Sequence, residues 1–182
     1  MTADNKEQFL ALYKPLHDRF ARYCSSQAYG LMETEDLMQE TILRTLQQFS
    51  TIRDKSRLLW YMIGVAGNIV KNQLRRQKFK GTYDEESAHK LVSSAGSPEL
   101  ALDIHYLYKA LQQLPARDKD ALILFEISGF SIREISEMQE CSEGAVKTRL
   151  SRSRQKLRDL LENDQVKPKE RSRSVSLFTL FI

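Results

Sequence analysis

Apolar side chains recur at helical spacing along almost the whole chain, and this pattern limits the fold more than any other feature of the sequence. The first such set follows the spacing i, i+3, i+7 and i+11: Phe9, Leu12, Leu16 and Phe20. The alternation that predicts strands is nearly absent. We therefore predict an all-α fold, with a first helix that ends before Tyr29-Gly30 and further helices over residues 34–49 and 58–78. Thr34 is the expected N-cap of the second helix.

Residues 81–100 interrupt this helical pattern. The stretch is rich in Gly, Ser, Pro and acidic side chains, which is typical of a flexible linker. Helical spacing resumes near Ala101. We therefore expect two small helical domains, over residues 1–80 and 101–162, joined by a flexible linker. Residues 163–182 are expected to form a disordered tail.

Composition and residue spacing argue against several classes of protein. No apolar run is long enough to span a bilayer and the N-terminus lacks a signal pattern, so we expect a cytoplasmic protein without membrane insertion. Cys24 and Cys141 have no second Cys nearby, which argues against a disulfide framework or a zinc site. His17, His89 and His105 pair with no nucleophile at a catalytic spacing, and no phosphate loop occurs. We expect no enzymatic activity, no cofactor and no metal.

The second half of the chain predicts two helices joined by a short turn. Pro115 suits the first position of a helix that ends near Gly129. A short helix then ends near Met138, the residues QECS turn the chain, and Ser142 can cap a last helix that runs to about Leu161. This order is typical of a helix-turn-helix domain.

The start of the short helix carries a specific capping pattern. Ser131 and Glu134 form the S-x-x-E capping box. Phe130 and Ile135 are placed to make a hydrophobic staple across it. Both patterns indicate a helix that begins directly after Ser131.

The last predicted helix carries six Lys or Arg and no acid over residues 144–158. At about 100° per residue, one narrow face is apolar and is expected to pack inward: Val146, Leu150, Leu157 and Leu161. The opposite face carries Thr148, Ser151 and Gln155. Cations flank it on both sides: Lys147, Arg154 and Arg158 on one, Arg149, Arg152 and Lys156 on the other. This arrangement predicts a helix in the DNA major groove, and the alternative is a solvated basic face.

The helix over residues 34–49 carries apolar and charged residues on the same side. Its core face is expected to consist of Met38, Ile42, Leu46 and Phe49. Leu37 and Leu43 then lie on the other face, among charged side chains, as they would in a protein interface. Two scattered surface leucines are the alternative.

The helix over residues 58–78 follows a basic loop and carries a polar stripe, Asn68, Asn72 and Arg76, with Arg75 adjacent. Trp60 and Tyr61 lie near its start. Amides, arginines and aromatic rings around a loop suit single-stranded DNA, whose bases stack on rings while cations hold the backbone. Core packing is the alternative for one of the two rings.

On these motifs the chain resembles the extracytoplasmic-function (ECF) sigma factors, a branch of the sigma-70 family. Leu114-Pro115 and the stretches GFSIREIS and GAVKTRLSRSR resemble region 4 of that family. The stretches EDLMQETILRTL and LLWYMIGVAGNIVKNQLRR resemble region 2, as in the sigma-E-like group. No region 3 lies between the two, which is typical of the ECF group.

The resemblance implies roles for three sets of residues. Those expected to dock on the clamp helices of the largest RNA polymerase subunit are Asp36, Leu37, Gln39, Glu40, Leu43 and Arg44. Those expected to contact the −10 element are Arg53, Lys55, Arg57, Trp60, Tyr61, Asn68, Asn72, Arg75 and Arg76. Those expected to contact the −35 element are Ser131, Arg133, Ser142, Glu143, Lys147, Thr148, Arg149, Ser151, Arg152, Arg154 and Gln155.

The implied function is that of a sigma factor, which directs core RNA polymerase to promoters and helps to open the −10 region. The implied partners are the polymerase clamp helices, the beta-subunit flap, promoter DNA and an anti-sigma factor. Asp84, Glu85 and Glu86 of the linker carry the further hypothesis that it lies in the RNA path of the polymerase. A stand-alone helix-turn-helix regulator is the alternative, and it would bind duplex DNA without polymerase.

Overall fold

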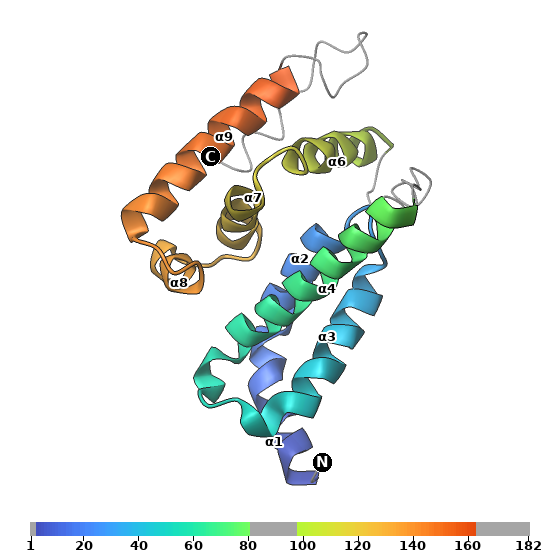
Figure 1. The fold of residues 1–182 in the computed structure, drawn as a ribbon, viewed down its shortest axis with the longest axis vertical. Coiled ribbons are helices and arrows are strands. Elements are labelled where there is room, and N and C mark those ends of the chain that lie inside the picture. The colour runs from blue at the N-terminus through green and yellow to red at the C-terminus, as the bar shows by residue number, and fades with distance from the viewer. Residues whose placement is uncertain (1–2, 81–97, 163–182) are drawn as a thin grey trace. The chain divides into compact units, whose positions relative to one another are not determined.

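The computed structural model describes residues 3–80 and 98–162, which form helices joined by short turns (Figure 1). No strand occurs within these ranges, and the all-α class is confirmed. The chain divides into two compact units, Met1–Leu91 and Val92–Ile182. The predictions for most of the linker and for the tail lie outside the described residues.

The first unit packs its longest helix, α4, against α2 and α3, and α3 and α4 run antiparallel (Figure 1). The elements in chain order are α1 Ala3–Tyr13, the 3-10 turn η1 Lys14–Leu16, α2 His17–Ala28, α3 Thr34–Gln48, the 3-10 turns η2 Phe49–Thr51 and η3 Lys55–Arg57, and α4 Leu58–Lys80. The predicted first helix is therefore two helices. Pro15 lies in the 3-10 turn between them, since proline has no N–H for a continuous helix.

Aromatic rings fill one end of the first unit's core. The Phe9 and Tyr13 rings stack with centroids 5.6 Å apart, and the Phe9 ring meets the edge of Phe49 at 5.5 Å. Tyr13 and Phe20 are also in edge contact, at 6.3 Å. Such pairs are favourable beyond the area that they bury. They hold α1 against the end of α3 and the start of α2.

The inner face of α3 differs from the prediction. Leu37, Thr41 and Thr45 are fully buried, whereas Met38, Ile42 and Leu46 are partly exposed. The Thr41 hydroxyl donates to the Leu37 carbonyl (2.7 Å) and the Thr45 hydroxyl donates to the Thr41 carbonyl (2.8 Å). A buried threonine that bonds its own helix leaves no polar group unpaired.

The C-terminal end of α3 agrees with the prediction, whereas its N-terminal end differs. Phe49 is buried as predicted. The N-cap, however, is Glu33 without a side-chain cap, and the expected cap, Thr34, is the first helical residue.

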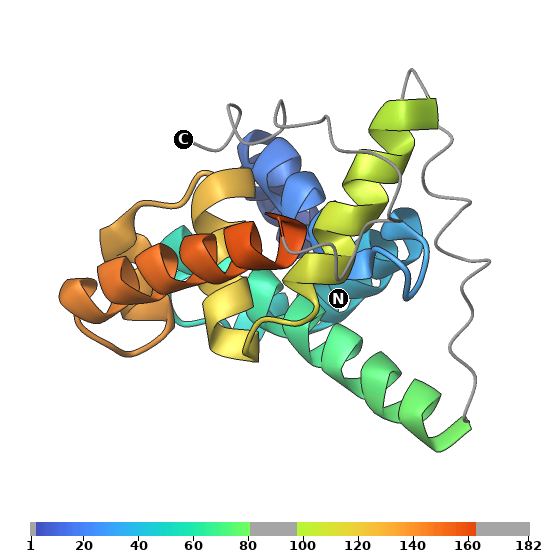
Figure 2. The same cartoon turned by 90° about the horizontal axis from the view of Figure 1, so that it is seen from above.

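The second unit brings α9 against α6, α7 and α8, and Figure 2 shows α9 as one uninterrupted helix. Its elements are α6 Pro98–Leu111, α7 Ala116–Leu122, the π-helical turn η5 Ile123–Ile127, α8 Ile132–Met138 and α9 Glu143–Glu162. Helix α6 thus begins inside the predicted linker. Pro115 is the N-cap of α7 (ψ 141°) rather than its first helical residue. Gly129, at φ +70°, follows the π turn and allows the chain to leave it.

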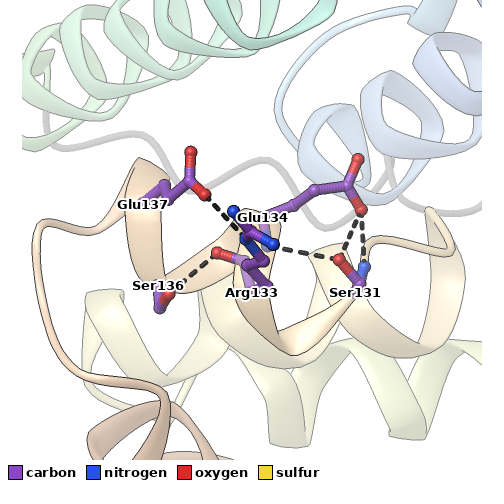
Figure 3. A network of polar contacts seen from close by, with 5 residues as sticks. All are labelled: Ser131, Arg133, Glu134, Ser136 and Glu137. Carbon is purple, nitrogen blue, oxygen red and sulfur yellow. Dashed lines mark hydrogen bonds and ion pairs between the residues drawn. The ribbon is translucent and has the colours of Figure 1, made fainter.

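The predicted capping box at the start of α8 is confirmed (Figure 3). The Ser131 hydroxyl oxygen accepts from the Glu134 N–H (3.2 Å), and the Glu134 carboxylate accepts from the Ser131 N–H (2.8 Å). Phe130 and Ile135, the predicted staple, are both buried. These bonds satisfy two N–H groups that would otherwise lack partners at the helix end.

Helix α8 ends in a Schellman motif built on a residue other than glycine. The Glu140 N–H donates to the Glu137 carbonyl (3.4 Å) and the Cys141 N–H donates to the Ser136 carbonyl (3.0 Å). Glu140 has φ +51°, in the left-handed region that a side chain with a Cβ adopts only at a cost. The turn therefore stores local backbone strain.

We expect Glu140→Gly to raise the free energy of unfolding of the second unit by about 1 kcal/mol, because glycine enters the left-handed region without steric cost. Urea titration followed by circular dichroism measures the change. Glu137→Gly, inside α8, is the control and should destabilise. A Glu140→Gly chain no more stable than the parent would contradict this account.

The two cysteine thiols differ in burial. Cys24 is fully buried and burial raises the pKa of its thiol to about 12, whereas Cys141 is partly exposed. Because the thiolate is the nucleophile, Cys24 is almost unreactive near neutral pH. The raised pKa also means that Cys24 stabilises the fold below pH 9.0, its ordinary pKa, and that this contribution is lost as pH rises toward 12.

We expect iodoacetamide at pH 8 to modify Cys141 alone in the folded chain, and both thiols after unfolding in urea. Mass spectrometry of the modified peptides measures the ratio. Modification of Cys24 should accelerate as pH rises above 9. Equal rates at the two thiols in the folded chain would rule out the buried environment of Cys24.

Candidate nucleic-acid and polymerase interfaces

The outer face of α9 is solvent-exposed, as predicted. Its exposed residues between the two ends are Lys147, Thr148, Ser151, Arg152, Gln155 and Lys156. Val146 and Leu150 are buried on the opposite face, together with Ser153. Leu157 and Leu161, expected in that buried set, are only partly buried. The exposed face presents hydroxyls, an amide and cations, and Asp159 adds an exposed acid near its end.

The start of α9 is held by its own polar side chains. Ser142 accepts a hydrogen bond from the Ala145 N–H (3.2 Å), which confirms its capping role. The Thr148 hydroxyl donates to the Gly144 carbonyl (2.9 Å). Ser142 and Glu143 are exposed at this end of the helix. Farther along, the Gln155 amide donates to Asp159 (2.9 Å).

Arg149 belongs to an internal network rather than to the exposed face. Its Nη1 donates to Gln139 Oε1 (2.7 Å) and to the Cys141 sulfur (3.1 Å), and its Nε lies 3.9 Å from Asp118. Its side chain is 22% exposed. These partners come from α7 and from the turn between α8 and α9, so Arg149 joins three elements.

Arg154 is likewise paired within the unit. Its Nε donates to Glu126 Oε1 (2.9 Å), and its guanidinium lies 5.6 Å from the centre of the Phe125 ring. Glu126 and Phe125 lie in the π-helical turn η5. Nothing in the local sequence indicates this pair, because its members are 28 positions apart.

The first turn of α8 offers a further exposed cation. Arg133 is 80% exposed and its Nε lies 3.3 Å from Glu137, one helical turn away (Figure 3). Such an exposed pair contributes little to stability, so Arg133 can exchange its partner for a phosphate. Ser131, two positions before it, is already engaged in the capping box.

In the first unit, Asp54 organises the basic loop. Its carboxylate accepts from the Ser56 N–H (3.0 Å) and hydroxyl, and lies 3.4 Å from Arg57 Nε. The hydrogen bonds from Ser56, with the Arg57 charge, hold the pKa of Asp54 below its usual range. The Arg57 guanidinium in turn lies 4.5 Å from the centre of the Trp60 ring, at cation–π distance.

Lys55 is held on the other side of the same loop. Its ammonium donates to Gln8 Oε1 of α1 (2.6 Å) and lies 4.6 Å from the centre of the Phe49 ring. Arg53, two residues earlier, is exposed. The predicted basic loop is therefore a set of two short 3-10 turns with defined contacts.

The exposed face of α4 matches the predicted polar stripe. Its exposed members are Tyr61, Asn68, Asn72, Arg75 and Arg76, and Lys71 adds a further cation. Trp60 is partly exposed, so neither of the two rings is a buried core residue. No acid occurs from Lys55 to Tyr83. This face can therefore meet a phosphate backbone without repulsion.

The outer face of α3 carries most of the predicted polymerase contacts. Leu43 is 56% exposed, and Asp36, Gln39 and Arg44 are also exposed. Arg44 forms an ion pair with Glu40, one turn away. Leu37 was expected here, but this expectation is wrong because its side chain lies wholly in the core.

The described part of the chain contains neither a metal-binding cluster nor a membrane-spanning helix. Within residues 3–80 and 98–162, no three His, Cys, Asp or Glu side chains gather in a way that could hold a metal ion. None of the helices described is long and apolar enough to cross a membrane.

Known families match both units. The family described as Sigma-70 region 2 matches residues 10–80, and the family described as Sigma-70, region 4 matches residues 104–157. The chain is 30% identical to the ECF RNA polymerase sigma factor EcfG of Rhodopseudomonas palustris, over 71% of this chain and 72% of that protein. It is 27% identical to the ECF RNA polymerase sigma factor SigX of Bacillus subtilis, over 92% and 94%.

A solved structure agrees with these sequence matches. The sigma factor RpoE of Bartonella quintana, crystallised in complex with the anti-sigma factor NepR, superposes with a TM-score of 0.62 and 26% identity. The match covers 90% of this chain and 100% of that one. On these findings the chain belongs to the sigma-70 family and is an RNA polymerase sigma factor of the ECF type, which directs the polymerase to promoters.

Proposed function

We propose a division of labour among three surfaces of this sigma factor. The outer face of α3 binds core polymerase, the exposed face of α9 binds the −35 element as duplex DNA, and the basic loop with α4 binds the −10 element as single strands. The observation that carries the proposal is the separation of charge. The exposed face of α4 is basic and free of acids, and that of α9 is basic with Asp159 as an exposed acid near its end, whereas that of α3 is mixed in charge and carries an exposed leucine.

For α9, the support comes from the order of its exposed side chains. Thr148, Ser151 and Gln155 can reach base edges while Lys147, Arg152 and Lys156 meet phosphates on either side of the groove. Ser131, Arg133, Ser142 and Glu143 lie at the starts of α8 and α9, where backbone N–H groups favour phosphate.

For the −10 element, the support comes from the Arg57–Trp60 pair beside an acid-free helix. A ring with a cation over it offers a stacking surface for a base, and Asn68 and Asn72 can donate to and accept from base edges. Arg53, Arg75 and Arg76 remain exposed to hold the backbone. Tyr61 is a second exposed ring on the same helix.

We also propose the finer properties that the family implies. Domain boundaries at 1–80 and 101–162 are proposed, and the matched regions, residues 10–80 and 104–157, support them. The chain has no catalytic role of its own and acts on the polymerase in the cytoplasm. An anti-sigma factor holds it inactive, a proposal supported by the complex in which the RpoE relative was crystallised.

We expect Leu43→Asp to weaken binding to core polymerase at least about tenfold, because a charge replaces an apolar contact at the interface. Arg152→Ala should leave core binding unchanged, weaken −35 binding and lower the magnitude of its salt slope by about 0.9, as expected for a phosphate contact. Titration of the labelled chain with core polymerase, and of the holoenzyme with duplex promoter DNA, measures the two steps.

Leu10→Asp is the matched control for the first change, since Leu10 is a similarly exposed leucine (49%) on α1. It should bind core polymerase like the parent chain. If Leu43→Asp and Arg152→Ala impair the same step, the division of labour is wrong. Tight duplex binding without affinity for core polymerase would favour a stand-alone regulator.

We expect Asp54→Ala to slow opening of the −10 region, although it removes a negative charge from a DNA-binding surface. Charge alone would strengthen DNA binding, whereas loss of the Asp54 contacts releases Arg57 and Trp60. The fluorescence of 2-aminopurine in the −10 non-template strand follows the opening. Asp18→Ala, which removes an exposed acid from α2, is the control and should leave opening unchanged. Faster opening in Asp54→Ala would refute an organising role for this carboxylate.

A further inference from the structure

Arg149, like Arg154, differs from the exposed cations of α9 because it is paired within the protein. Lys147, Arg152 and Lys156 are exposed, whereas the Arg149 side chain is 22% exposed and directs its donors into the protein. A guanidinium has five N–H donors in a fixed plane and can therefore join several acceptors at once. Here it joins Gln139 Oε1 at 2.7 Å and the Cys141 sulfur at 3.1 Å.

The network continues beyond Arg149 to the start of α7. Gln139 Nε2 donates to the backbone carbonyl of Arg117 (3.0 Å), while its Oε1 accepts from Arg149. Asp118, the next residue of α7, lies 3.9 Å from Arg149 Nε. One side-chain amide and one guanidinium thus connect α7, the end of α8 and the body of α9.

The backbone of the turn makes this network possible. Glu140 is the left-handed residue of the Schellman motif, and its two neighbours, Gln139 and Cys141, both contact the same guanidinium. The turn therefore contacts Arg149 through the residues on both sides of Glu140. Since α9 leaves this turn two residues after Cys141, the contacts fix the direction of the helix relative to α7 and α8.

We infer that Arg149 is a positioning residue, which with Gln139 sets the orientation of α9 for DNA binding, and that it does not itself contact DNA. The inference rests on the proposed binding of α9 to the −35 duplex. It revises the expectation for Arg149, because its Nη1 bonds Gln139 and Cys141 and its side chain is only 22% exposed, whereas Lys147 and Arg152 are exposed.

The salt dependence of DNA binding separates a positioning residue from a phosphate contact. Each phosphate contact contributes about 0.9 to the slope of log K against log salt concentration. Substitution of a residue that only orients the helix lowers the affinity at every salt concentration and leaves that slope unchanged. We would measure both quantities for the holoenzyme by fluorescence anisotropy. The probe is a duplex promoter selected from a randomised library with the unaltered holoenzyme.

We expect Arg149→Gln to bind this duplex about tenfold more weakly with an unchanged slope. Arg149→Lys should show the same loss, because one ammonium cannot bond Gln139 and Cys141 and also lie near Asp118, as Nη1 and Nε of the guanidinium do. Gln139→Ala should be as weak as Arg149→Gln, and the double variant no weaker than either, since both remove one network. Arg152→Gln, the control, should lower the magnitude of the slope by about 0.9.

Chemical modification tests the same network without a substitution in α9, in case Arg149→Gln does not fold. Iodoacetamide on Cys141 of the unaltered chain places a bulky group between the sulfur and Arg149. It should weaken duplex binding without changing the slope. Cys141→Ser, whose hydroxyl can still accept, should bind like the parent and resist the reagent. Helix content by circular dichroism establishes that each chain compared is folded.

Three results would overturn the inference. A slope lowered by about 0.9 in Arg149→Gln, with affinity kept in Arg149→Lys, would make Arg149 a phosphate contact. Unchanged affinity in Arg149→Gln would remove it from DNA binding altogether, and unchanged affinity after modification of Cys141 would show that the network does not orient α9. A different outcome concerns the proposed function: if Arg152→Gln binds DNA with the affinity and slope of the parent, the proposed role of α9 in DNA binding is wrong.

Discussion

Helix α9 leaves its turn in a direction that follows from the left-handed backbone of Glu140. That conformation closes the Schellman bonds of α8 and presents Gln139 and Cys141 to Arg149. The capping box of α8 and the Ser142 cap of α9 then fix the two helix starts on either side. Backbone strain at one residue is thus balanced by hydrogen bonds along the whole helix-turn-helix. Local geometry of this kind is the scaffold on which a DNA-binding face depends.

Acids beside the basic surfaces serve to hold cations in place. Asp54 lies against Arg57, Asp118 near Arg149 and Glu126 against Arg154. Each pair restricts a guanidinium that would otherwise sample many rotamers. A side chain that is ordered before binding loses less entropy when a partner arrives. This explains how residues 101–162, which carry ten acidic and ten basic side chains, can still present a basic face on α9.

The features predicted from the sequence are those encoded by nearby residues. Ser131 and Glu134 are three positions apart, so their capping box could be recognised directly, and the exposed face of α9 follows from helical geometry alone. The inner face of α3 could not be derived in this way. Buried threonines look polar in the sequence, and only the bonds of Thr41 and Thr45 to their own helix explain why they replace Met38 and Ile42 in the core. The partners of Arg149 and Arg154 could not be predicted from the sequence either, because they lie in other elements and are brought together only by folding.

The hydrogen bond between Lys55 and Gln8 has a thermodynamic consequence for the first unit. It ties the basic loop to α1, which otherwise packs through Phe9 and Tyr13. A nucleic-acid phosphate that draws Lys55 away from Gln8 weakens the docking of α1. By reciprocity, whatever tightens the docking of α1 makes Lys55 a poorer phosphate ligand by the same factor. If the basic loop binds promoter DNA as proposed, α1 and this loop are coupled sites linked through the Lys55 ammonium.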